Sequence, residues 1–306
     1  MTGANSGLGF QTSLELARHG AAVVLACRDQ TRGNQALERL RRQLPNAELA
    51  LATLDLADLA SIRRFAEGYA ATHQTLDLLV NNAGVMAIPR RVTVDGFEMQ
   101  FGTNHIGHFA LTGRLFPVIA ATPRSRVVTV SSGAHRGGRI DFSDLQGERK
   151  YGLWSAYCQS KLANLLFAFA LQRKIDAAGL GVLSVAAHPG FAATNLAAAG
   201  PRMGGHRFLE RLFRAGTRLV AQSDVKGALP ILYAATADDV SGGAFYGPDG
   251  LAEQRGYPKR VSAAARANDE DTAQRLWQVS EELTGVRYDL LDGVPVRPAA
   301  DIPSPA

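Results

Sequence analysis

The stretch Thr2-Gly3-Ala4-Asn5-Ser6-Gly7-Leu8-Gly9 has the glycine spacing of a phosphate-binding loop. Its glycines allow a tight turn, a close approach of the backbone to a pyrophosphate and the packing of a helix against a sheet. A helix that begins near Gly7 would point its N-terminal amides at the phosphates. The alternative is a glycine-rich turn without a ligand, but a strand is expected at 22–27, one helix length further on. The stretch therefore predicts a dinucleotide-binding fold.

Short apolar runs alternate with longer amphipathic stretches along the chain, which is typical of repeated βαβ units. The runs are mostly apolar throughout, as strands buried on both faces require. They cover residues 22–27, 48–54, 76–80, 126–131 and 181–187, and a further short strand is expected at 244–246. The pattern predicts an α/β fold: a Rossmann-type, doubly wound parallel sheet with helices on both faces, in one domain over residues 1–285.

The region after Pro189 departs from this alternation. Residues 195–222 are rich in Gly and Arg, and we expect them to form a substrate lid. Ser223 or Asp224 is a suitable N-cap, so a helix is expected to begin there.

A last helix is expected at 270–283, with Asn268 or Asp269 as its cap and Gly285 at its end. Residues 286–306 follow, and their final dozen or so are rich in Pro and Ala. We expect residues 286–306 to form a disordered tail.

Only Met1 precedes the phosphate loop, although such a loop must extend from the end of a strand. The first, central strand of the fold is therefore missing from this sequence. A gap in the middle of a sheet would leave backbone groups without ladder partners and would expose apolar surface. We therefore expect an N-terminally shortened chain whose true start lies upstream. The alternative is a sheet that tolerates the gap.

Composition excludes several classes of protein. The net charge is +5, but the basic residues are scattered among acidic ones, so no nucleic acid partner is expected. Two cysteines, Cys27 and Cys158, fit neither a disulfide framework nor a zinc site, and we expect no metal and a reducing, cytoplasmic setting. No stretch approaches the roughly 18 uncharged apolar residues that a membrane span needs.

Arg28 follows the strand predicted at 22–27, at the position where an NAD site would place Asp or Glu for the adenosine ribose. A guanidinium there pairs with a 2′-phosphate, so NADP(H) is favoured over NAD(H). In the alternative, Arg28 is a surface residue and Asp29 binds the ribose.

Two further groups stand at predicted strand ends and face the same crevice. Asp55, with Leu56 after it, can accept a hydrogen bond from the adenine amino group. Asn82, Ala83 and Gly84 form a small, polar turn over the adenosine ribose. Each group alone could be ordinary turn chemistry, and their order along the chain is the stronger argument.

Tyr157 and Lys161 lie at i and i+4, on one face of a helix expected to begin near Ser155. The lysine ammonium should lower the pKa of the phenol and suit it to proton transfer. The strand at 126–131 ends in Ser131-Ser132, so a hydroxyl from this pair reaches the same crevice and can bind the reacting oxygen.

Asn104 follows the turn at 82–84, and its side-chain amide could hold a water molecule that relays protons to Lys161. With Asn104, Ser132, Tyr157 and Lys161 as the catalytic set, the chain resembles the short-chain dehydrogenase/reductase family over about residues 2–250.

The resemblance implies that Pro189, Gly190 and Thr194 contact the nicotinamide half of the cofactor. The Cys-Arg-Asp at 27–29, the Asn-His-Ile-Gly-His-Phe at 104–109 and the long segment between Ser132 and Tyr157 resemble the retinol dehydrogenase and WW-domain oxidoreductase branch.

The expected function is therefore hydride transfer between nicotinamide and the carbonyl or alcohol group of a small, lipophilic substrate. A non-catalytic dinucleotide sensor or scaffold is the first alternative, and an inactive, N-terminally truncated form of the enzyme is the second. Family resemblance also implies a homodimer or homotetramer.

Overall fold

The computed structural model describes residues 1–190 and 223–292. The strands run nearly as predicted: β1 (Val23–Cys27), β2 (Leu49–Thr53), β3 (Leu78–Asn81), β4 (Arg126–Val130), β5 (Leu183–Ala187), β6 (Phe245–Pro248) and β7 (Pro258–Arg260). All pairs are parallel except β6 with β7. The predicted parallel sheet is thereby confirmed. β7 was not expected, because its three residues are a proline and two exposed cations, which carry no apolar strand pattern.

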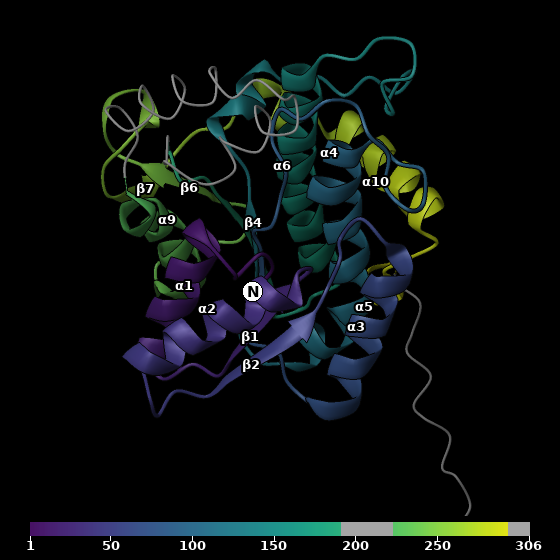
Figure 1. Ribbon diagram of the computed structural model, residues 1–306. Helices are drawn as coiled ribbons and strands as arrows, with labels where there is room; N and C mark the ends of the chain where they lie inside the picture. The colour runs from purple at the N-terminus through teal and green to yellow at the C-terminus, as the bar shows by residue number, and fades with distance from the viewer. Residues whose placement is uncertain (191–222, 293–306) are drawn as a thin grey trace, which may run out of the picture.

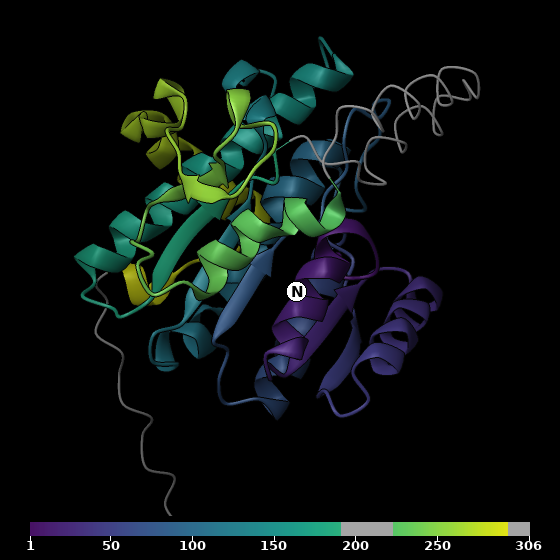
Figure 2. The same cartoon turned by 90° about the vertical axis from the view of Figure 1, so that its left-hand side faces the viewer.

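Helices cover both faces of the sheet. One face carries α1 (Gly7–Arg18), α2 (Gln30–Gln43) and α9 (Asp224–Thr236), and Figure 2 shows α1 and α9 side by side. The other face carries α3 (Leu59–Thr72), α5 (Gly107–Ala121) and α6 (Leu153–Ala177), with α10 (Glu270–Thr284) packed outside α6 (Figure 1). Shorter elements are α4 (Met99–Phe101), the π-helix η1 (Gly102–Ile106) and the 3-10 turns η2 (Gly133–Gly137), η3 (Leu251–Glu253), η4 (Ala265–Asn268) and η5 (Asp289–Leu291).

The predicted N-caps of α9 and α10 and the predicted end of α10 are confirmed. Ser223 caps α9 by accepting from the Lys226 amide, and Asp269 caps α10 by accepting from the Thr272 amide. Gly285 ends α10 with a left-handed φ of 63°. Among the described residues no helix is long and apolar enough to cross a bilayer.

The sheet is divided where the missing first strand was predicted. β1 pairs with β2 alone, while β3 to β7 form a separate five-stranded sheet. Met1 to Gly3 lie between the two parts: the Met1 carbonyl accepts from the Ala26 amide at 2.9 Å, and the Thr2 amide donates to the Val80 carbonyl at 3.1 Å. This short segment connects the two sheets only at the end from which the phosphate loop emerges.

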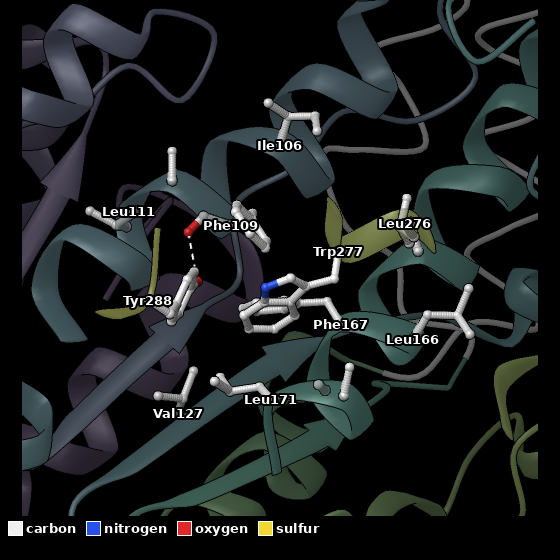
Figure 3. Close-up of a cluster of buried hydrophobic side chains, with 14 of the residues drawn as sticks. Ile106, Phe109, Leu111, Val127, Leu166, Phe167, Leu171, Leu276, Trp277 and Tyr288 are labelled. Atoms are coloured by element: carbon white, nitrogen blue, oxygen red, sulfur yellow. Dashed lines mark hydrogen bonds between the residues drawn. The ribbon is translucent and has the colours of Figure 1, made fainter. Parts of the chain in front are cut away.

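An aromatic cluster forms the core between α5, α6 and α10 (Figure 3). Tyr288 is 1% exposed, and its hydroxyl donates to the Phe109 carbonyl at 2.8 Å. Its ring lies 4.7 Å from that of Trp277, centroid to centroid. The predicted disordered tail is therefore wrong for residues 286–292, because buried aromatic and aliphatic side chains anchor them; residues 293–306 lie outside the described part of the chain.

Candidate active site

A cleft of about 720 Å³ opens at the carboxyl ends of the parallel strands, a size typical of small-molecule sites. Every cofactor-binding residue predicted within the described part of the chain lines it: Gly3, Asn5, Ser6, Gly7, Leu8, Gly9, Arg28, Asp55, Leu56, Asn82, Ala83, Gly84, Tyr157, Lys161, Pro189 and Gly190. Thr194 and the expected lid at 195–222 lie outside the described residues.

The glycine-rich loop has the shape of a phosphate cradle. Gly3 and Gly7 have φ of 65° and 56°, which side chains disfavour, and a Cβ on Gly9 would lie 2.3 Å from the Gly3 carbonyl oxygen. Ser6 is the N-cap of α1 but its side chain does not cap the helix. The first-turn amides are thus left for an anion, and the residues present fit a dinucleotide pyrophosphate.

Thr2 holds this loop against the turn after β3. Its Oγ1 accepts from the amides of Asn82 and Ala83, each at 2.9 Å, and its carbonyl accepts from the Asn82 side-chain amide at 2.8 Å. His108 on α5 also contacts Thr2 Oγ1, at 3.0 Å. The two predicted cofactor-binding turns are therefore connected into one wall.

Arg28 and Asp29 stand directly after β1 and differ in their contacts. Arg28 is exposed and lines the cleft. The Asp29 carboxylate caps α2 by accepting from the Arg32 amide at 3.0 Å, and does not line the cleft. The Asp29 carboxylate is thus engaged in capping α2, which favours Arg28 as the residue that binds the adenosine ribose.

Tyr157 and Lys161 project from α6 into the cleft, with Lys161 Nζ 5.9 Å from the centre of the Tyr157 ring. Lys161 Nζ donates to the Val130 carbonyl at 3.1 Å, which fixes the cation beside β4. Ser132 also lines the cleft, and its Oγ accepts from the Ala134 amide at 3.2 Å. The Ser131 hydroxyl instead donates to the Lys161 carbonyl at 2.8 Å, so it is a structural group of the α6 packing.

Burial sets the protonation of this pair. It raises the pKa of Tyr157 to about 12, against the smaller, lowering effect of the nearby Ser132 hydroxyl. It also lowers the pKa of Lys161 to about 8. The expected lowering of the Tyr157 pKa by Lys161 is not found: desolvation of the phenolate raises the pKa, and Lys161 is not among the groups that shift it. At neutral pH the site holds a phenol beside a lysine cation.

Asn104 lies within the π-helix η1; it is buried and does not line the cleft itself, and its side chain lies behind Gly84 and Val85, which do. Its Oδ1 accepts from the Val85 amide at 2.8 Å, and its Nδ2 donates to the Val85 carbonyl and to Ser160 Oγ, each at 2.9 Å. Both Nδ2 protons of Asn104 are already used, so neither can donate to the water molecule that this side chain was predicted to hold. The side chain instead fixes the segment after Gly84.

Several lining residues escaped prediction. Arg136 follows Ser132, His188 precedes Pro189, and Ala252 to Gln254 follow β6. The available signal was position: each lies in the loop that follows a strand of the parallel sheet, at the end where ligands bind. Trp154 also lies in the lining and is half exposed.

Comparisons with known proteins agree with this geometry. Residues 1–203 match the short chain dehydrogenase family model. The chain is 44% identical over 292 residues to retinol dehydrogenase 13 of Homo sapiens, covering 94% of this chain and 84% of that protein. It is 40% identical over 291 residues to retinol dehydrogenase 12 of Homo sapiens, covering 94% and 86%.

A solved structure of an uncharacterized protein from Mycobacterium Paratuberculosis is also similar, with 43% identity and a TM-score of 0.76, covering 94% of this chain and 92% of that chain. The chain belongs to the short-chain dehydrogenase/reductase family. It is an oxidoreductase that binds NAD(P) and acts on CH–OH or C=O groups of a small molecule. The predicted family, and the likeness to the retinol dehydrogenase branch, are confirmed.

Proposed function

We propose that the protein is an NADP(H)-dependent oxidoreductase that interconverts a lipophilic aldehyde or ketone and its alcohol, with Ser132, Tyr157 and Lys161 as its catalytic residues and Asn104 as a positioning residue. The observation that carries the proposal is a pair of hydroxyls, on Ser132 and Tyr157, that line one cleft together with the phosphate loop. Two hydroxyl donors in one cleft suit a carbonyl oxygen that gains negative charge in the transition state.

In the reductive direction the nicotinamide supplies the hydride when it is bound. Ser132 and Tyr157 hold the substrate oxygen, and Tyr157 donates its proton to that oxygen. Burial keeps Tyr157 protonated at neutral pH, which suits a donor. Lys161, fixed by the Val130 carbonyl, places a positive charge beside the phenolate that remains. Asn104 acts through Val85, by fixing the wall of the cleft. Oxidation of the alcohol uses the same groups in reverse.

Arg28 is the basis of the proposed NADP(H) preference. It is an exposed cation at the end of β1, and the neighbouring carboxylate of Asp29 is engaged in capping α2. An exposed guanidinium pairs with a 2′-phosphate, whereas it offers nothing specific to two ribose hydroxyls.

Arg28→Ala tests this preference, with Arg42→Ala, an exposed arginine in the last turn of α2, as the matched control. Charge-assisted hydrogen bonds contribute about 1.5–3 kcal/mol, so the dissociation constant for NADPH should rise about 10- to 150-fold while that for NADH stays within about twofold. Equal changes for both dinucleotides, or none, would remove Arg28 from the recognition of the phosphate.

The lipophilic substrate class is supported by the relatives named retinol dehydrogenase and by apolar side chains in the cleft, among them Val85, Met86 and Trp154. The test is a series of straight-chain aldehydes of increasing length, assayed with NADPH. We expect kcat/KM to rise with chain length, because each buried methylene contributes about 0.8 kcal/mol. A preference for short, hydroxylated substrates would contradict this class.

A further inference from the structure

Glu253 is an acidic residue in the cleft lining that neither the proton transfer nor the cofactor cradle uses. It belongs to η3, in the loop after β6, and its side chain is only 22% exposed. Glu253 and the preceding Ala252 have left-handed φ values of 56° and 51°. Two consecutive non-glycine residues in that region are strained, and such strain persists only where surrounding contacts fix it.

The two carboxylate oxygens of Glu253 bind two different loops. Oε1 accepts from Arg136 Nη2 at 3.0 Å, and Arg136 lies in η2, directly after Ser132. Oε2 lies 3.0 Å from His188 Nε2, and His188 begins the loop after β5. One carboxylate therefore connects the loops that follow β4, β5 and β6.

His188 carries the connection onward to the Pro189–Gly190 turn. The Gly190 amide donates to His188 Nδ1 at 3.3 Å, so the ring proton is on Nε2 and points at Glu253. Burial lowers the pKa of His188 to about 4, so the ring is neutral at pH 7. A Cβ on Gly190 would lie 2.5 Å from the Gln254 carbonyl oxygen, so this turn packs tightly on the Glu253 loop.

The Ser132 loop has a second attachment to the same region. His135 Nδ1 lies 2.7 Å from the Ser132 carbonyl, while its Nε2 accepts from the Ala264 amide at 3.1 Å. Arg136 Nη2 also donates to the Ser262 carbonyl, at 3.1 Å. Residues 253–264 thus hold the loop after Ser132 through the side chains of His135 and Arg136. His135 also contacts the carbonyl of Ser132 itself.

We propose that Glu253 is a positioning residue for the reaction: through Arg136 it fixes the Ser132 loop, and through His188 it fixes the Pro189–Gly190 turn. Glu253 thereby holds two walls of the cleft at one spacing. Displacement of a reacting group by about 1 Å costs up to about 100-fold in rate, so loosening this connection lowers turnover without removing any group that touches the substrate.

Glu253→Gln tests the proposal. Glutamine keeps the size of the side chain but offers one acceptor oxygen where two donors need one each, so either Arg136 or His188 loses its hydrogen bond to residue 253. Glu282→Gln, an exposed substitution on α10, is the matched control. We expect Glu253→Gln to lower kcat by about 10- to 100-fold with NADPH, while the control stays within about twofold of the unmodified protein.

Two readouts distinguish positioning from a purely stabilising role. Hydrogen exchange in the protein without cofactor should be at least about tenfold faster at the amides of 133–138 and at Gly190 in Glu253→Gln, with α10 unchanged. The dissociation constant for NADPH should also rise, since the Pro189–Gly190 turn lines the cleft. A lower melting temperature with unchanged exchange, NADPH binding and kcat would overturn the proposal.

If Glu253→Gln fails to fold, Arg136→Ala breaks the branch to Ser132, together with the bond to the Ser262 carbonyl, at a half-exposed side chain. Its expected result is a lower kcat with NADPH binding unchanged, and an unchanged kcat would overturn that branch. The proposal rests on the oxidoreductase function proposed above. An unmodified protein that turns over no carbonyl substrate would contradict that function, whereas the exchange and NADPH-binding readouts would still test Glu253.

Discussion

Two adjacent serines follow β4, and we expect Ser132 to take part in the reaction and Ser131 only in the packing of α6. Ser132→Ala removes a hydroxyl that lines the same cleft as Tyr157. Ser131→Ala removes a buried hydroxyl that donates to the Lys161 carbonyl at 2.8 Å. The two variants lose the same atoms from neighbouring positions, so each is the control for the other.

We expect Ser132→Ala to lower kcat and Ser131→Ala to lower the melting temperature. Loss of one donor to a developing oxyanion costs about 2.7–4 kcal/mol, so Ser132→Ala should lower kcat by about 100- to 1,000-fold, and Ser132→Thr should retain much of the activity. Loss of one buried hydrogen bond costs about 0.5–1.5 kcal/mol, so Ser131→Ala should lower the melting temperature by a few degrees and leave kcat within about threefold.

The assay is NADPH oxidation with a saturating aldehyde, together with thermal unfolding of both variants. A Ser132→Ala protein with nearly full kcat would refute the reasoning. So would a Ser131→Ala protein that unfolds normally and has lost its activity, because its hydroxyl would then be the one that serves the substrate.

Three further predictions follow from the described contacts. Because burial lowers the pKa of Lys161 to about 8, kcat for reduction should fall as pH rises above about 8, and a flat profile to pH 10 would contradict a role for the cation. Tyr288→Phe should destabilise the protein by about 1–3 kcal/mol in denaturant unfolding, since the Phe109 carbonyl loses its donor; no change would show that 286–292 are not part of the core. Five apolar, β-branched residues joined before Met1 should enter the gap between β1 and β3 and raise the melting temperature by at least about 5 °C, whereas an unchanged value would mean that the gap accepts no strand.

The cofactor cradle was predictable from sequence because its chemistry is local. Gly3, Gly7 and Gly9 are needed for backbone reasons that a single stretch displays, and Asn82 to Gly84 stand at a strand end that apolar patterning locates. The spacing of Tyr157 and Lys161 likewise places both on one helix face without any tertiary information.

Contacts between distant segments could not be predicted in this way. Glu253 meets Arg136 and His188 across 117 and 65 residues of sequence, and no short pattern marks it. The residues that follow Tyr288 have the composition of a disordered tail. Only the burial of Tyr288 against α5 shows that it belongs to the core. The side chain of Asn104 was placed in the right region, but its partners depend on the π-helical turn of η1.

The most direct measurement concerns Tyr157, the proposed proton donor. Single-turnover reduction of an aldehyde by Tyr157→Phe should be slowed by at least about 1,000-fold relative to the unmodified protein, while the dissociation constant for NADPH and the melting temperature change little, because only the hydroxyl is lost. A Tyr157→Phe protein that binds NADPH normally and retains more than a tenth of the rate would contradict the proposed mechanism.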